Sequence, residues 1–271
     1  MFRKVFISLL VFVSAAVAAV AASSVALYAS AQVNFDKGYL AKGIVGVKYT
    51  STVEKKTKVL VQYGEKKYQY NIKSSDKTQY FPLQLGNGEY KVGVYENIEG
   101  TKYSAVATDT VQVKLDDSSK VFLNSIQLIE WSEKMNTVTL AGELTKNKAT
   151  DKEKIEVCYQ YMVQQFKYDF AKLSNLQYDY IPVIDDVVKK KLGICYDYSA
   201  VLASMLRSQG IRCKLVMGYT KNVKEYHAWN EIYLDGKWVT VDSTYDSQMY
   251  LGNVKFSFEK SKGDYTTSYE Y

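Results

Sequence analysis

The sequence has little proline, histidine or cysteine. Its 271 residues include 2 prolines, 1 histidine and 3 cysteines. So little proline, with only 15 glycines, leaves little material for long flexible linkers, and 47% hydrophobic residues suit one or two globular domains. The odd number of well-separated cysteines does not fit a disulfide framework. With one histidine and no C-x-x-C pair, a structural zinc site is not expected, and we predict neither metal nor cofactor.

A strong excess of one charge is also absent. The 35 basic and 29 acidic side chains give a formal net charge of +6. No basic stripe with interleaved aromatic residues is visible, so we do not expect the chain to bind nucleic acid. The mild positive charge suits an anionic cell-wall or membrane surface. The 25 tyrosines favour strand-rich surfaces.

A long apolar run begins near the N-terminus. Two basic residues precede apolar residues over 5–22, and small side chains at Ala29 and Ala31 fit a cleavage site. We predict that residues 1–31 are an export signal, which is either cleaved or kept as an anchor, because the run approaches the ~20 residues that span a bilayer. The protein is therefore expected outside the cytoplasm, secreted or at the cell surface. Membrane contact is expected only if this segment is retained.

Two regions with different patterns follow. Residues 32–115 read as short strands separated by turn residues, as in Thr57–Tyr63, Gly64-Glu65 and Lys66–Ile72. This pattern predicts a small all-β sandwich, which serves either to position its neighbour or to bind a partner. Residues 116–250 switch to helical periodicity and are predicted to form a second domain, with a C-terminal extension over 251–271. The fold class is therefore α+β.

Helical signals are strongest after Thr150. Thr150 and Glu153 form a capping box, and apolar residues at helical spacing predict a helix from Asp151 to about Phe166. Cys158 lies on its apolar stripe, and Cys213 lies on the apolar side of a later strand, so both are expected in the core. A disulfide between these two is left open, because the sequence does not give their separation.

A second helix is predicted to begin at the remaining cysteine. The segment Gly193-Ile194-Cys195 opens a helix that runs to Ser208 and stops at Gly210. Unpaired N–H groups and the helix dipole favour a thiolate at Cys195. Asp197, in the first turn, is expected to complement the same dipole as a structural residue.

The turn Asp235-Gly236 fixes the register of a hairpin. It is a favoured type I′ sequence, and pairing Leu234 with Lys237 puts Trp229 opposite Asp242 and His227 opposite Thr244. By alternation, His227 and Asp242 share one face as diagonal neighbours. At Cβ separations of roughly 7 Å or less, such a pair can form a hydrogen bond.

Cys195, His227 and Asp242 together supply a nucleophile, its base and a group that orients the base. A lone histidine in a strand is ordinarily structural, so the geometry alone leaves a structural role open. Three segments point to a family. They are Gly193-Ile194-Cys195-Tyr196-Asp197-Tyr198, Tyr226-His227-Ala228-Trp229-Asn230-Glu231 and Trp238-Val239-Thr240-Val241-Asp242-Ser243-Thr244.

These segments resemble the three motif blocks of the transglutaminase-like superfamily, and the likeness covers roughly residues 120–250. The β region resembles the N-terminal accessory domains of exported bacterial members. The resemblance implies a papain-like core, with helices packed on an antiparallel sheet, and a cysteine-protease-like catalytic triad of Cys195, His227 and Asp242.

The resemblance also implies an enzyme, a transglutaminase-like acyltransferase or a hydrolase. Cys195 would take an acyl group from an amide of a protein or cell-wall peptide, and the thioester would pass to water or to an amine. The Cys195 N–H should donate to the oxyanion, while the second donor is left open among Tyr168, Tyr178 and Tyr180. Trp229 either walls the acyl site or packs the hairpin.

The sequence allows two other hypotheses about function. In one, the chain is a catalytically inert surface interaction protein that binds through the β module. In the other it is a glycan-removing amidase, which is disfavoured because the chain lacks a cysteine-rich metal module. The sequence does not name the substrate, the acceptor or the oligomeric state.

Overall fold

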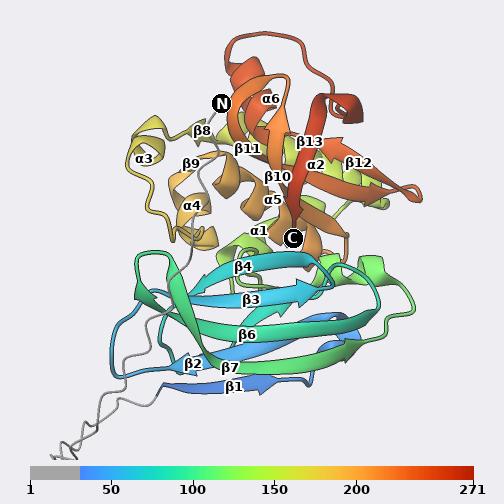
Figure 1. Ribbon diagram of the computed structural model, residues 1–271. Helices are drawn as coiled ribbons and strands as arrows, with labels where there is room; N and C mark the ends of the chain where they lie inside the picture. Colours follow the sequence, from blue (N-terminus) through green and yellow to red (C-terminus); the bar gives the residue numbers. More distant parts are fainter. Residues whose placement is uncertain (1–30) are drawn as a thin grey trace, which may run out of the picture.

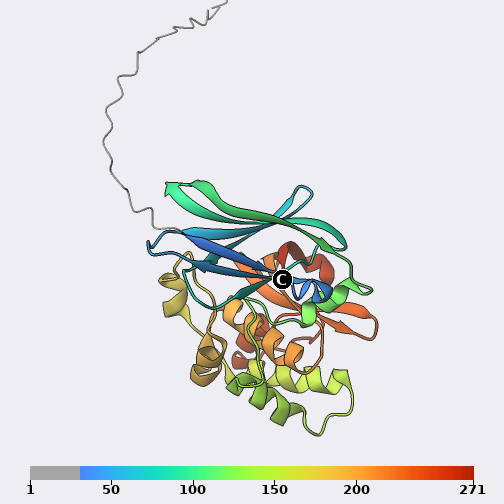
Figure 2. The same ribbon diagram turned by 90° about the horizontal axis from the view of Figure 1, so that it is seen from below.

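The computed structural model describes residues 31–271, so the predicted export segment lies outside the described residues except for Ala31. Two parts stack on each other, a β sandwich below and a helical part above (Figure 1). From below, helices α1 (Asn136–Thr145) and α2 (Asp151–Gln165), in yellow-green, lie on the side away from strands β6 (Gly88–Glu99) and β7 (Lys102–Val113) (Figure 2). Within residues 31–271, no helix is long and apolar enough to cross a bilayer.

The lower part is built from two antiparallel sheets, as the sequence predicted. One has the order β1-β2-β5 and the other the order β4-β3-β6-β7. The strands are β1 (Gln32–Asp36), β2 (Ile44–Thr50), β3 (Thr57–Tyr63), β4 (Lys66–Ile72), β5 (Gln79–Pro82), β6 (Gly88–Glu99) and β7 (Lys102–Val113).

Turn residues and alternation explain these strands. Gly64 has a positive φ of 56° and opens the two-residue turn between β3 and β4. Along β4, Tyr68, Tyr70 and Ile72 are buried and alternate with more exposed residues. The buried side of each sheet faces the other, and this defines the predicted sandwich.

The upper part combines helices with a sheet of order β12-β11-β10-β13. Its longer strands are β10 (Cys213–Thr220), β11 (Val223–Leu234), β12 (Lys237–Val241) and β13 (Tyr265–Glu270), and two short strands, β8 (Lys167–Tyr168) and β9 (Leu192–Gly193), pair in parallel. The helices are α1 (Asn136–Thr145), α2 (Asp151–Gln165), α3 (Phe170–Ser174), α4 (Ile184–Lys190), α5 (Cys195–Ser208) and α6 (Ser243–Leu251). The segment 251–271 thus contributes β13 to the sheet.

The predicted helix signals are confirmed. Thr150 and Glu153 form the capping box of α2, and Cys158 is completely buried in the apolar stripe of that helix. Helix α5 ends at Ser208, and Gly210 follows with a φ of 78°, the left-handed conformation that glycine favours. The α+β fold class is therefore confirmed, with α5 packed on β10 and β11 of an antiparallel sheet.

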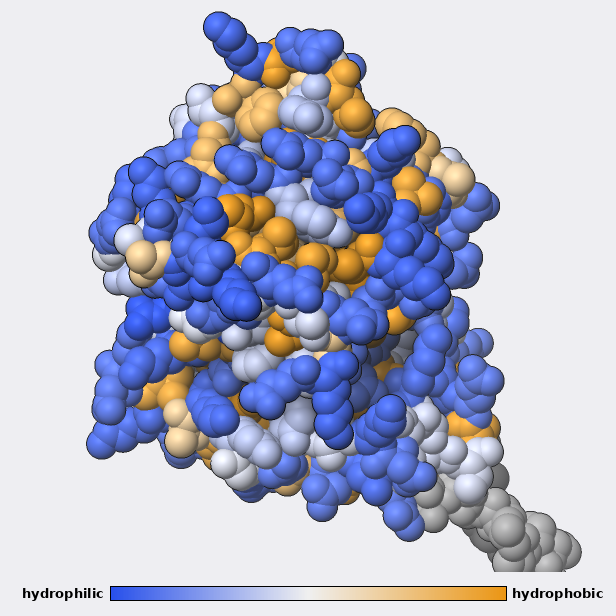
Figure 3. All heavy atoms as spheres, turned by 180° about the vertical axis from the view of Figure 1, so that it is seen from behind, coloured by the Kyte–Doolittle hydropathy of each residue, from blue (hydrophilic) through white to orange (hydrophobic). Residues whose placement is uncertain are grey.

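The two parts share one apolar core. Tyr271, just beyond β13, lies with its ring 5.5 Å from Tyr68 and 5.8 Å from Tyr70, both on β4. The amide of Gln84 donates to the carbonyl of Glu270 at 2.9 Å. From behind, the surface is mostly hydrophilic, with apolar side chains gathered in the upper part (Figure 3). The sandwich and the sheet of the upper part are joined by these buried contacts.

Arg207 ties the end of α5 to this junction. It is 2% exposed, and its guanidinium donates at 2.8 Å to the carbonyls of Cys213, Asn124 and Tyr271. These carbonyls come from three separate segments. A single buried side chain thus links the helix to the sheet and to the chain that enters the helical part.

Replacing Arg207 with methionine should therefore destabilise the whole protein. Arg207→Met keeps the apolar stem but withdraws the donor from three carbonyls, which should lower the free energy of unfolding by about 2–4 kcal/mol, measured by urea denaturation. Arg212→Met is the control, because Arg212 pairs with Asp117 nearer the surface and should change it by less than about 1 kcal/mol. Equal effects of the two changes would contradict this reading.

Candidate active site

Cys195 is the first residue of α5 and follows the short strand β9. It is partly exposed, whereas Cys158 and Cys213 are completely buried, and all three thiols are free. The disulfide left open between Cys158 and Cys213 is therefore not formed. Burial raises the pKa of each of these two thiols to about 12, which keeps them protonated and unreactive.

The hairpin β11–β12 has the predicted register. Asp235 and Gly236 have φ of 50° and 80°, as a type I′ turn requires, and Leu234 pairs with Lys237. The ladder continues only as far as Asn230 opposite Val241. The predicted pairs of Trp229 with Asp242 and of His227 with Thr244 are therefore wrong.

The reason is that the strand gives way to a helix at Asp242. Asp242 is the N-cap of α6, and its Oδ1 accepts the N–H of Tyr245 at 3.0 Å. A serine and a threonine follow it, and both lie in the helix, so β12 offers no partner to His227, which pairs only with Gly218 on β10. The side chains of His227 and Asp242 still meet, with Nε2 2.8 Å from Oδ2.

Asp242 is completely buried, and both of its oxygens are used. Besides the bonds to His227 and Tyr245, its Oδ2 accepts the hydroxyl of Tyr265 at 3.1 Å. Tyr265 opens β13, and no motif in the segment 251–271 pointed to it. A buried carboxylate with three donors has its hydrogen-bonding capacity satisfied and holds the imidazole in one orientation.

The His227 ring lies between Asp242 and the nucleophile. It is 4% exposed, bonds Asp242, and lies close enough to the Cys195 thiol for that group to act on its pKa. With Nε2 on the carboxylate, Nδ1 is the nitrogen left for the thiol. Burial by itself would lower the pKa of His227, but the bonds to Asp242 and Cys195 and their charges outweigh it and raise the pKa to about 10.

Trp229 packs the hairpin and does not line an open site. It is 1% exposed, and its ring stacks on His227 with centroids 6.4 Å apart. Gly218 on β10 leaves room for it, because a Cβ at Gly218 would lie 3.0 Å from the indole and 2.1 Å from the Thr266 carbonyl oxygen. Of the two roles considered for Trp229, packing is the one that the structure supports.

The three upstream tyrosines lie in different places. Tyr168 is next to Cys195: its phenol faces the Cys195 backbone N–H, and burial and the charge of Cys195 raise its pKa. The Tyr180 hydroxyl instead donates to Asp197. Tyr178 is 64% exposed and lines a hollow beside the β sandwich. Only Tyr168 is therefore placed to reach an oxyanion at Cys195.

Comparisons with known proteins agree with the motif blocks. Residues 138–243 match the model of the transglutaminase-like superfamily. Kyphoscoliosis peptidase is 29% identical over 118 residues in Homo sapiens and 28% identical over 131 in Mus musculus, covering 40% and 44% of this chain. The chain spans only 18% and 20% of the length of these relatives.

Two solved structures are similar to this chain at low scores. A candidate cysteine protease from Cytophaga hutchinsonii has a TM-score of 0.44 and 16% identity, over 70% of this chain and 72% of that chain. The periplasmic domain of TgpA from Pseudomonas aeruginosa, bound to ethylmercury, has a TM-score of 0.38 and 15% identity, over 79% and 76%. At these scores the likeness supports no inference about activity.

Residues 138–243 therefore match the transglutaminase-like superfamily, a cysteine-based catalytic family, as the three motif blocks predicted. The match contains all three residues of the site, Cys195, His227 and Asp242. Within residues 31–271, no group of three histidine, cysteine or acidic side chains is arranged to hold a metal ion.

Because the chain has one histidine, the ring signals of His227 can be followed by NMR without assignment. We expect a titration midpoint near pH 10, in line with its pKa of about 10. Asp242→Asn removes the carboxylate and should lower the midpoint by more than one unit. Asp264→Asn, which changes an acid paired with Lys221 nearer the surface, should leave it unchanged. A wild-type midpoint near 6.5 would contradict the prediction that Asp242 raises the pKa of His227.

The same shift predicts a pH dependence of stability. The pKa of His227 lies above its ordinary value of 6.5, so its protonated form stabilises the fold fully below pH 6.5. This contribution is lost as the pH rises toward 10. The difference in unfolding free energy between wild type and Asp242→Asn should accordingly shrink between pH 6.5 and 10, as measured by urea denaturation at each pH.

Proposed function

We propose that the chain is a cysteine-dependent enzyme that transfers acyl groups from amide bonds of proteins or cell-wall peptides. The observation that carries this proposal is the His227 ring, which bonds Asp242 through Nε2 and lies close to the Cys195 thiol. Cys195, His227 and Asp242 would then supply the nucleophile, the base and the orienting group of covalent catalysis. Cys195 is also the one thiol of the described chain that is not buried.

The proposed reaction begins with the Cys195 thiolate attacking the amide carbonyl carbon. The electron pair of the carbonyl bond moves to oxygen, and the Cys195 N–H at the start of α5 stabilises that charge. As the carbonyl re-forms, the C–N bond breaks and the His227 imidazolium gives its proton to the departing amine. An acyl thioester on Cys195 remains, while Asp242 stays ionised and holds the imidazole.

The second half removes the acyl group. Water or an amine attacks the thioester, His227 accepts its proton, and the thiolate leaves. Attack by water makes the protein a peptidase or amidase, and attack by an amine makes it a transglutaminase. The name of kyphoscoliosis peptidase supports the first outcome, and the superfamily name supports the second. We propose the acyl-enzyme that both outcomes share, and the experiment below determines whether water or an amine is the acceptor.

We also propose that the protein works outside the cytoplasm, secreted or held at the cell surface. The apolar N-terminal run and the small residues before Gln32 support this location. Cell fractionation followed by N-terminal sequencing tests it, since a cleaved signal would leave a new terminus near Gln32.

The reaction is tested by mass spectrometry of wall and protein extracts incubated with the enzyme and a primary amine. Wild type should produce either new cleavage ends or new amine-linked glutamines, and Cys195→Ala should lower either yield at least about 10³-fold. Ser208→Ala, at the far end of the same helix, is the control that should keep full activity. Equal yields from Cys195→Ala and wild type would favour the inert interaction protein instead.

Tyr168 is proposed as the second oxyanion donor because its hydroxyl lies beside the Cys195 amide. Tyr168→Phe should lower kcat about 10²-fold, the usual cost of losing one donor, while Cys195 keeps its rate of alkylation by iodoacetamide. Tyr178→Phe is the matched control and should leave kcat unchanged, since Tyr178 lies away from Cys195 in the hollow. A kcat of Tyr168→Phe equal to that of wild type would remove Tyr168 from the oxyanion site.

A further inference from the structure

A buried carboxylate lies two residues beyond the nucleophile. Asp197 is completely buried in the first turn of α5. Its Oδ2 accepts the Ile194 N–H at 2.8 Å, and its Oδ1 accepts the hydroxyl of Tyr180. Gly193 is needed beside it, because a Cβ there would lie 2.6 Å from the Cβ of Asp197. These contacts fix the turn that presents Cys195, and they place an acidic side chain two residues beyond the nucleophile.

Lys172 on α3 supplies the opposite charge. Its Nζ lies 2.8 Å from Oδ2 of Asp197 and 3.0 Å from the Tyr180 hydroxyl, and its side chain is 26% exposed. Asp169 holds the start of α3, because its Oδ1 accepts the Lys172 N–H and its own N–H donates to the Gly193 carbonyl at 2.9 Å. The ammonium is thus tied to the segment that leads into the nucleophile.

Few other charges face this cluster. Burial raises the pKa of Tyr168, Tyr180 and Tyr196, so these phenols stay neutral at physiological pH. The ionisable side chains around the thiol and Asp197 include two bases, His227 from β11 and Lys172 from α3. They also include three phenols, those of Tyr168 from β8, Tyr180 and Tyr196. The charges of Glu225 and Asp169 act on the phenols of Tyr168 and Tyr180, respectively. Of these, His227 and Lys172 are the cations. His227 bonds Asp242, so Lys172 is the cation that pairs with Asp197.

We propose that Lys172 is a positioning residue that neutralises the buried Asp197 carboxylate, so that this anchor of the nucleophile turn does not oppose the Cys195 thiolate. The inference rests on the proposed function of Cys195. A like charge close to an ionising group disfavours its charged form, and an adjacent opposite charge cancels that effect. The buried acid can then fix the turn without making the nucleophile less reactive.

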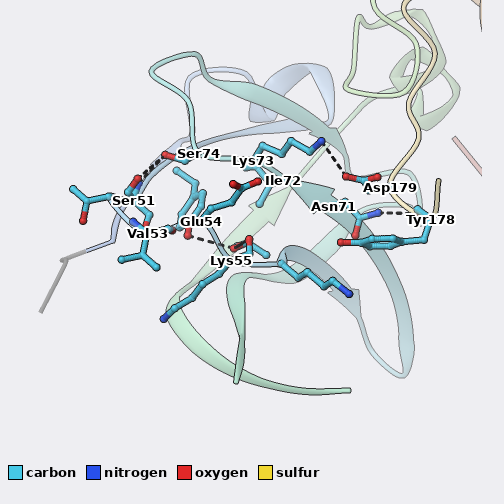
Figure 4. A pocket seen from close by; sticks show the side chains of 14 residues that line it. Ser51, Val53, Glu54, Lys55, Asn71, Ile72, Lys73, Ser74, Tyr178 and Asp179 are labelled. Carbon is cyan, nitrogen blue, oxygen red and sulfur yellow. Dashed lines mark hydrogen bonds and ion pairs between the residues drawn. The ribbon is translucent and has the colours of Figure 1, made fainter. Parts of the chain in front are cut away.

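The loop that carries Tyr180 is held by the β sandwich. Figure 4 shows the Lys73 ammonium paired with Asp179 and the Asn71 amide directed at the Tyr178 carbonyl, beside a hollow of about 670 Å³. Tyr178 and Asp179 directly precede Tyr180 in the chain. The sandwich therefore helps to place the hydroxyl that, with Lys172, binds Asp197.

The test is the pH dependence of Cys195 alkylation by iodoacetamide, with the modified residue identified by peptide mapping. Lys172→Met should raise the midpoint of the profile by about one pH unit, which is about a tenfold slower alkylation below the midpoint. Lys172→Arg should restore the wild-type midpoint. Lys237→Met, which breaks only an exposed ion pair with Glu259 away from this loop, is the control and should not move it.

A double variant separates charge from folding. If Lys172 acts by neutralising Asp197, then Lys172→Met combined with Asp197→Asn removes both charges and should return the midpoint toward that of wild type. A midpoint unchanged in Lys172→Met, with wild-type Cys195 reactive near neutral pH, would overturn this inference and leave the proposed function standing. If wild-type Cys195 reacts like an ordinary free thiol, both are overturned.

Discussion

The buried carboxylate of Asp242 is bound by three donors from three different elements. It accepts from the first turn of α6, from His227 on β11 and from Tyr265 on β13. Leaving such a group unpaired in the interior would be costly, so each donor constrains the other two. The orientation of the imidazole, the start of α6 and the docking of the last strand are thus set by one side chain. The position of the nucleophile is set separately, by the turn before α5.

That turn depends on contacts well outside the motif around Cys195. Asp197 receives Lys172 and Tyr180 from the segment that links α2 and α5, and this segment in turn contacts β4 of the sandwich. Buried tyrosines on β4 also pack against Tyr271 next to β13. The geometry of the site is therefore a property of both parts of the molecule, although Cys195, His227 and Asp242 all come from one.

Much of this arrangement follows from local signals in the sequence. The Asp235-Gly236 turn fixed the register of the hairpin, the capping box began α2, and Gly210 ended α5, because each depends on a few neighbouring residues. The register failed at Asp242, where the capping preference of an aspartate followed by serine and threonine ended the strand. Tyr265 and Lys172 escaped prediction because their partners lie 23 and 25 residues away and no periodicity joins them.

The shared core between the sandwich and the catalytic sheet limits how this protein can be rebuilt. A β module joined only by a linker could be exchanged between enzymes as an interchangeable cassette. Here the rings of Tyr68 and Tyr70 and the amide of Gln84 contact the end of β13 and Tyr271 beyond it. The same strand begins with Tyr265, whose hydroxyl bonds Asp242. A chimaera that kept Cys195, His227 and Asp242 but took its sandwich from another protein would have to reproduce these contacts with β13. Without them it would lose the hydrogen bond from the Tyr265 hydroxyl to Asp242, the partner of His227.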